Sequence, residues 1–241
     1  MPIGPWGWYH LACFGLALPY LAMKSAARLP ALSQRPRKQH FISVLVVQGV
    51  TVVLSLGVAY LEGIPLWPRA APPLAAVAAG LVLLAGCYLA LKPRWREAVA
   101  RRDPRVHFAM PRDAVERRLW VAVSVAAGLG EEITYRGVMY ALLWRLTQDP
   151  FTAAVGTAAL FGAAHAVQGW KGVGAIALIS LGLQGLVLLA GSLYVAMAVH
   201  VLYDVAAGFT YGRLGEELGY PVEGVPPAQT TGAGPEAGPA V

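Results

Sequence analysis

The sequence predicts an all-α protein, a polytopic transmembrane helix bundle of about seven membrane helices. Of its 241 residues, 57% are hydrophobic and only 13% are charged, whereas roughly 25% of a typical soluble protein is charged. The charged residues also cluster, which leaves long stretches with almost none. Stretches close to the ~20 residues that a spanning helix needs indicate a membrane protein rather than a soluble protein with a large core.

Seven apolar segments give the order of the elements. The fourth is long enough to begin in the interface and to continue through the bilayer. Asp149 and Pro150 suit the start of the fifth, because aspartate caps helix N-termini and proline is tolerated in the first turn. Gly182, Gly185 and Gly191 are expected to break or tilt the sixth. The segments lie near residues 6–23, 41–61, 73–91, 117–146, 151–168, 172–190 and 192–212.

Most basic residues lie between the segments, where they indicate topology. They follow the first and third segments, while the loop after the second contains only Arg69. The positive-inside rule therefore places the N-terminus outside and the C-terminus in the cytoplasm. We expect an integral protein of a bacterial plasma (inner) membrane, whose partners include the lipid bilayer. Because the net charge of +6 reflects these loops, we expect no nucleic-acid partner.

The segment Gly128–Gly137, "GLGEEITYRG", places ionisable groups where the surrounding sequence is apolar. An ionisable side chain at the bilayer centre costs about 2.5–3.5 kcal/mol, so these groups should face the bundle interior, a partner or water. Glu132 and Arg136 have i,i+4 spacing and can form an ion pair. Glu131 lies about 100° around the helix from Glu132 and remains the free carboxylate. A purely structural ion pair would explain Glu132 and Arg136 but not Glu131.

Two later apolar segments contain further polar groups. In "LFGAAHAV" His165 follows Phe161 by four residues, and in "MAVHVLYD" His200 and Asp204 share a face with i,i+4 spacing. Each could be only a local helix contact. Together with Glu131, however, they can converge at one depth of a small bundle as a site that binds a metal or activates water.

Three other histidines are interpreted differently. His10, His40 and His107 lie near segment ends or in basic loops. We expect them at the surface or at the level of the lipid headgroups.

The three motifs in this order resemble the CPBP intramembrane proteases, also called the CAAX protease and bacteriocin-processing or Abi family. "EEITYRG" is similar to the EExxxR motif of that family, "FGAAH" to its FxxxH motif and "HVLYD" to its Hxxx[N/D] motif. The resemblance implies the fold of the CAAX prenyl endopeptidases. It divides the chain into N-terminal membrane helices with basic cytoplasmic loops (1–111), a CPBP-like catalytic core (112–212) and a tail that we expect to be disordered (213–241).

The resemblance implies hydrolysis of a peptide bond in a membrane-associated or lipidated protein or peptide. The implied site residues are Glu131, Glu132, Arg136, His165, His200 and Asp204. Two mechanisms stay open: water activated by glutamate and histidine, or a zinc ion held by Glu131, His165 and His200. The absence of HExxH excludes a zincin. The alternatives are a non-catalytic immunity or partner-binding membrane protein and a proton-coupled transporter, although no inverted repeat with broken helices is evident.

Overall fold

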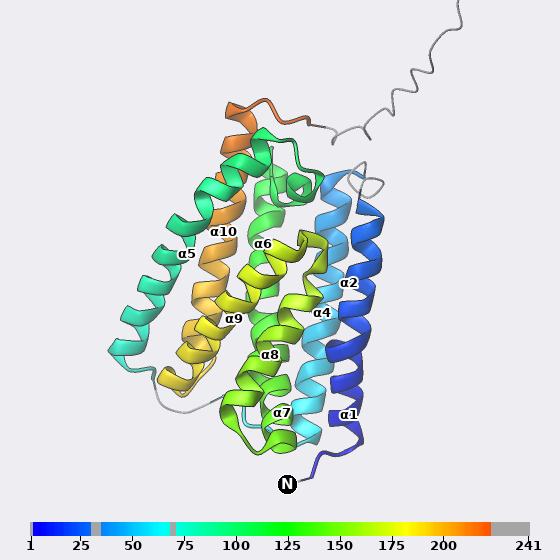
Figure 1. Ribbon diagram of the computed structural model, residues 1–241, viewed down its shortest axis with the longest axis vertical. Coiled ribbons are helices and arrows are strands. Elements are labelled where there is room, and N and C mark those ends of the chain that lie inside the picture. Colours follow the sequence, from blue (N-terminus) through cyan, green and yellow to red (C-terminus); the bar gives the residue numbers. More distant parts are fainter. Residues whose placement is uncertain (1, 30–34, 68–70, 223–241) are drawn as a thin grey trace, which may run out of the picture.

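The computed structural model describes residues 2–29, 35–67 and 71–222, and these are helical without a β-strand, which confirms the all-α bundle (Figure 1). The π-helices are η1 and η3, and the 3-10 helices are η2 and η4. The elements are α1 (Pro5–Ala12), η1 (Cys13–Ala17), α2 (Leu18–Ala27), α4 (Arg37–Leu61), α5 (Leu74–Ala100), η2 (Pro104–Ala109), α6 (Ala114–Glu131), η3 (Glu132–Met139), α7 (Tyr140–Thr147), α8 (Pro150–Ala164), η4 (Ala166–Gln168), α9 (Trp170–Ala190) and α10 (Tyr194–Glu217).

All seven predicted segments contain helix. Among the described residues, α4, α5, α9 and α10 are long and apolar enough to cross a membrane, and α8 is a shorter apolar helix. The first and fourth segments are each one run of helix that a π-helical stretch divides, α1–η1–α2 and α6–η3–α7. The apolar helical bundle is therefore confirmed, whereas the number of spans stays a prediction.

Helix ends follow local chemistry at some positions and tertiary packing at others. Asp149 caps α8 as expected, because its carboxylate accepts a hydrogen bond from the backbone N–H of Thr152 at 2.7 Å. Of the three glycines expected to break α9, Gly182 and Gly185 do not interrupt it: the helix continues to Ala190, and Gly191 ends it in the left-handed region with φ 63°. Glycine inside a helix costs only about 1 kcal/mol, which packing can offset.

The last helix extends beyond residue 212, after which the tail was predicted to begin. α10 continues to Glu217, because its last turns pack against α5 and η2, with Leu214 buried beside Trp95 and Met110. Tyr220 is buried as well, and its carbonyl accepts a hydrogen bond from Arg112. Of the tail predicted at 213–241, residues 223–241 lie outside the described residues.

The ends of α4, α6 and α10 meet at one end of the bundle, opposite the N-terminus (Figure 1). Buried Arg37 donates to Glu116 at 3.1 Å and to the carbonyl of Val222 at 2.8 Å. His107 is buried beside them, contrary to the expected surface position. Burial, together with the cations of Arg37 and Arg112, lowers the pKa of His107 to about 4. The start of α4, the start of α6 and the residues after α10 therefore lie together, whereas the orientation of this end in the membrane stays a prediction.

Glycines allow the central helices to approach closely. A Cβ at Gly128 of α6 would lie 2.5 Å from the Cγ2 of Val201 in α10. At Gly162 of α8 it would lie 2.8 Å from the carbonyl oxygen of Val173 in α9. Small residues at such crossings are typical of membrane helix packing, where close backbone approach provides the van der Waals contact.

The crossing at Gly128 can be tested with one methyl group. We expect Gly128→Ala to lower the thermal midpoint in detergent, at a cost of about 1–3 kcal/mol, because the added carbon overpacks the α6–α10 contact. Gly185→Ala in α9 is the matched control, since a Cβ there meets no atom within 4 Å. Equal midpoints for the two variants would contradict the close crossing.

Candidate active site

The segment "GLGEEITYRG" forms the junction between α6 and η3. α6 ends at Glu131, and the π-helix begins at Glu132. π-helical turns within longer helices often occur at functional sites. No residue pattern in this segment predicts a π-helix, and the 100° step of an α-helix does not apply within it.

Two hydrogen bonds from side chains to backbone carbonyls join η3 to the N-terminal helix run. The ring of His10 donates from Nε2 to the carbonyl of Thr134 at 3.1 Å, and Tyr135 donates to the carbonyl of Phe14 at 3.3 Å. His10 is completely buried, so its predicted interfacial position was wrong. These bonds fix η3, which begins at Glu132, against α1 and η1.

Glu132 is the completely buried member of the glutamate pair. Its Oε1 lies 3.1 Å from Nη1 of Arg136, so the ion pair expected from the spacing is present. The same oxygen accepts a hydrogen bond from Nδ1 of His200 at 2.8 Å. The Arg136 guanidinium lies over the ring of Phe161, 4.1 Å from its centroid, which adds a cation–π contact. Glu132 thus links α10 to η3, and its arginine links both to α8.

Glu131 faces a different set of partners, and its two oxygens are divided between them. Gln48 of α4 donates from Nε2 to Oε1 at 2.7 Å. The other oxygen, Oε2, lies 3.8 Å from Nε2 of His165 and 3.8 Å from Nε2 of His200. This oxygen and the two ring nitrogens therefore converge from three helices.

Hydrogen bonds orient both histidines in the same sense. His165 is the C-cap of α8, and its Nδ1 lies 2.8 Å from the carbonyl of Phe161, which can only accept. His200 likewise directs Nδ1 at the Glu132 carboxylate. Both rings thus carry a proton on Nδ1 and present Nε2 to Glu131.

Asp204 lies at the edge of the same site. Its Oδ2 is 3.6 Å from Nε2 of His200. Asp204 was a candidate to orient His200, but the shorter contact of that ring is the one with Glu132 at 2.8 Å. Asp204 thus faces Nε2 of His200 and not the Nδ1 that bonds to Glu132.

Burial separates the supporting groups from the accessible ones. The side chains of Glu132 and Arg136 are 0% exposed, whereas those of Glu131, His165 and Asp204 are 16%, 25% and 27% exposed. A molecule from outside the bundle can therefore contact the edge of the site that contains Glu131, whereas it cannot contact the buried pair of Glu132 and Arg136.

Glu131, His165 and His200 share one feature with the ligands of a zinc site but lie too far apart to bind zinc as they stand. Zinc-ligating histidines donate their second ring N–H to a carbonyl or carboxylate, as His165 and His200 do here. Ligand atoms on tetrahedral zinc lie about 3.3 Å apart, closer than the 3.8 Å between each Nε2 and Glu131. Within residues 2–29, 35–67 and 71–222, no three His, Cys, Asp or Glu residues are arranged to hold a metal ion.

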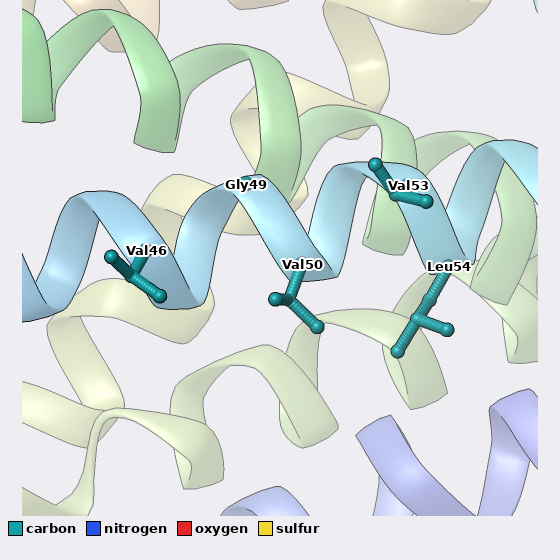
Figure 2. Close-up of a pocket in the computed structure, with 5 residues that line it drawn as sticks. All are labelled: Val46, Gly49, Val50, Val53 and Leu54. Carbon is teal, nitrogen blue, oxygen red and sulfur yellow. The ribbon is translucent and has the colours of Figure 1, made fainter.

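A shallow apolar hollow on the outside of α4 is separate from this site. Val46, Val50, Val53 and Leu54 line it together with Gly49 (Figure 2). By helical geometry these residues lie on the side of α4 opposite Gln48. Their exposed apolar side chains suit contact with lipid tails.

Sequence reasoning missed Gln48 and the roles of His10 and Ser55. Ser55 and Thr134 share a hydrogen bond of 2.8 Å between α4 and η3. Gln48 and Ser55 are spaced by seven residues, so they lie on one face of an otherwise apolar helix. That spacing was the available signal for an inward polar face.

Residues 115–206 match the family model described as type II CAAX prenyl endopeptidase Rce1-like. This stretch, less than half of the chain, contains all three motifs, and the match confirms the resemblance to the CPBP family. It supports a CAAX-type intramembrane protease in general terms. Comparisons with curated proteins and with solved structures gave no match.

The buried ion pair predicts a large stability effect. Arg136→Met should destabilise the protein by about 3–5 kcal/mol, because it removes the cation paired with the buried carboxylate of Glu132. Adding Glu132→Gln should recover part of this loss, since the uncompensated charge is then absent. Unfolding in detergent measures both.

The matched control is Arg117→Met, which breaks the exposed pair with Glu216 at 3.4 Å. Exposed pairs contribute about 0–1 kcal/mol. Similar losses for Arg136→Met and Arg117→Met would contradict a stabilising role for the buried pair.

Proposed function

We propose that this protein is an intramembrane endopeptidase that hydrolyses a peptide bond in a membrane-associated or lipidated protein or peptide. The observation that carries the proposal is the convergence of Glu131 Oε2 with Nε2 of His165 and of His200. The family match supports the same general activity.

Glu131 is the general base in this proposal. A water molecule between its Oε2 and Nε2 of His165 transfers a proton to the carboxylate, and the hydroxide attacks the carbonyl carbon of the substrate. As the C–N bond of the tetrahedral intermediate breaks, Glu131 returns the proton to the leaving amine. One carboxylate thus supplies both proton transfers.

His200 stabilises the oxyanion of that intermediate. Because its Nδ1 proton is directed at Glu132, Nε2 can donate to the oxyanion only in the imidazolium form. The carboxylates of Glu132 and Asp204 flank the ring and compensate that positive charge. Arg136 in turn neutralises Glu132 and keeps it in place.

A zinc-assisted mechanism is the second version of this proposal. His165, His200 and Glu131 would hold the ion after moving closer together, and the ion would polarise the carbonyl or lower the pKa of a bound water. The described residues, as they stand, are not arranged to hold an ion.

The substrate class follows from the surroundings of the site. Glu131 lies within an apolar bundle whose outer helices expose mainly apolar side chains, so a substrate that partitions into the membrane reaches it most readily. A prenylated CAAX peptide, taken from the description of the matched family, is the first probe. If the protein is instead a non-catalytic immunity or partner-binding protein, no cleavage product should form.

The enzyme proposal predicts strongly non-additive losses. Glu131→Gln, His165→Asn and His200→Asn should each remove nearly all cleavage, and a double variant should lose little more than a single one, because the groups act as a unit. Cleavage is measured with a fluorescence-quenched farnesylated CAAX peptide and by comparing membrane proteomes of cells with wild-type and Glu131→Gln protein.

Glu97→Gln is the control, because Glu97 is an exposed carboxylate paired with Arg101 on the outside of α5. It should retain full activity. Graded, additive losses without any cleaved product would exclude the protease and favour the binding protein.

Metal dependence separates the two versions of the mechanism. If water is activated by Glu131 and His165 alone, protein freed of metal by a chelator retains its activity, and purified protein contains no stoichiometric zinc by elemental mass spectrometry. Loss of activity with the chelator, rescue by zinc, and loss of bound zinc in His165→Asn would instead establish the metal version.

A further inference from the structure

The Glu131 carboxylate is held from outside the matched stretch, by a residue of α4. Gln48 donates from Nε2 to Oε1 of Glu131 at 2.7 Å across 83 positions of sequence. This is the one hydrogen bond of that carboxylate among the residues that the structure describes. The candidate base therefore depends on a helix that contains none of the three motifs.

The bond orients the carboxylate of Glu131 so that its second oxygen faces the site. Oε1 is occupied by the amide, and the two histidine nitrogens approach the other oxygen, Oε2. A carboxylate without this donor could rotate about its last torsion, which is broad and nearly two-fold. The amide thus fixes the plane of the base.

The close packing of α4 against α6 supports a specific contact. A Cβ at Gly130 would lie 3.0 Å from Oε1 of Gln48 and 3.0 Å from Cγ2 of Val52. The absence of a side chain at position 130 therefore leaves room for the amide beside Glu131.

The amide is also costly to place here. Oε1 of Gln48 is buried without a hydrogen-bond partner, and an unsatisfied buried polar atom costs about 1–3 kcal/mol. The opposite side of α4 is wholly apolar at the hollow in Figure 2. A hydrophobic side chain at position 48 would avoid that cost, so the donation to Glu131 is the benefit that the amide provides.

We propose that Gln48 is a positioning residue that holds Glu131 with Oε2 directed at His165 and His200. The inference rests on the proposed function, since it concerns the alignment of the base. Gln48 itself touches neither histidine nor water in this role. Its effect should appear in the rate of the chemical step and not in substrate affinity.

The experiment compares two hydrogen bonds from α4, of which only one reaches Glu131. Gln48→Met removes the donor with little change in length, and Ser55→Ala removes the neighbouring bond to Thr134 without touching Glu131. The full-length protein in nanodiscs is assayed with the farnesylated quenched peptide, or with a substrate found by the proteome comparison. Thermal midpoints are measured on the same samples.

The expected result separates rate from stability. Gln48→Met should lower kcat by about 10- to 100-fold with KM within about twofold, because small misplacement of a catalytic group is costly. Ser55→Ala should keep its kcat and lose thermal stability. If Gln48→Met does not fold, Gln48→Asn, which keeps the amide but shortens its reach, should show a smaller loss of kcat.

Each other outcome identifies what has failed. Unchanged kcat in the Gln48 variants that fold overturns the positioning role and leaves the protease standing. Losses of kcat that parallel the loss of thermal stability in both Gln48→Met and Ser55→Ala show a merely structural bond, which also overturns it. Absence of cleavage by the wild-type protein, on the peptide and in membranes, overturns the proposed function and the inference together.

Discussion

The rest of this structure depends on one buried carboxylate, that of Glu132. It is completely buried in an apolar bundle and is stabilised by Arg136 from its own helix and His200 from α10. A charge in such surroundings requires partners with good geometry. The bond to His200 also fixes the ring, so the neutralisation of a buried charge and the orientation of a candidate catalytic histidine are the same interaction.

Close backbone contact makes that interaction possible. His200 follows Val199 and precedes Val201, and Val201 packs directly against Gly128 of α6. The π-helical turn that begins at Glu132 is held by bonds from α1 and α4, among them those of His10 and Ser55 to Thr134. The N-terminal helices lack motifs, yet their bonds to Thr134 contribute to the stability of this turn.

The two glutamates show how neighbouring identical residues obtain different environments. Glu132 points into the protein, where its oxygen is shared by two cationic or proton-donating partners. Glu131 is partly accessible, held by the neutral amide of Gln48 and faced by two ring nitrogens. The amide of Gln48 orients the carboxylate of Glu131 without forming an ion pair with it. The arrangement suits a supporting role for one carboxylate and proton transfer for the other.

The sequence by itself determined the helical bundle, the order of its elements, the cap at Asp149 and the pair between Glu132 and Arg136, because hydrophobic length, capping and i,i+4 spacing are local properties. It also indicated which polar residues could meet. Only the tertiary structure decided that Glu132 and not Asp204 fixes His200, that His10 is buried, and that Gln48 reaches Glu131. These contacts join residues as far as 68, 124 and 83 positions apart. They depend on helix crossings and on a π-helical turn, which leave no periodic signal in the chain.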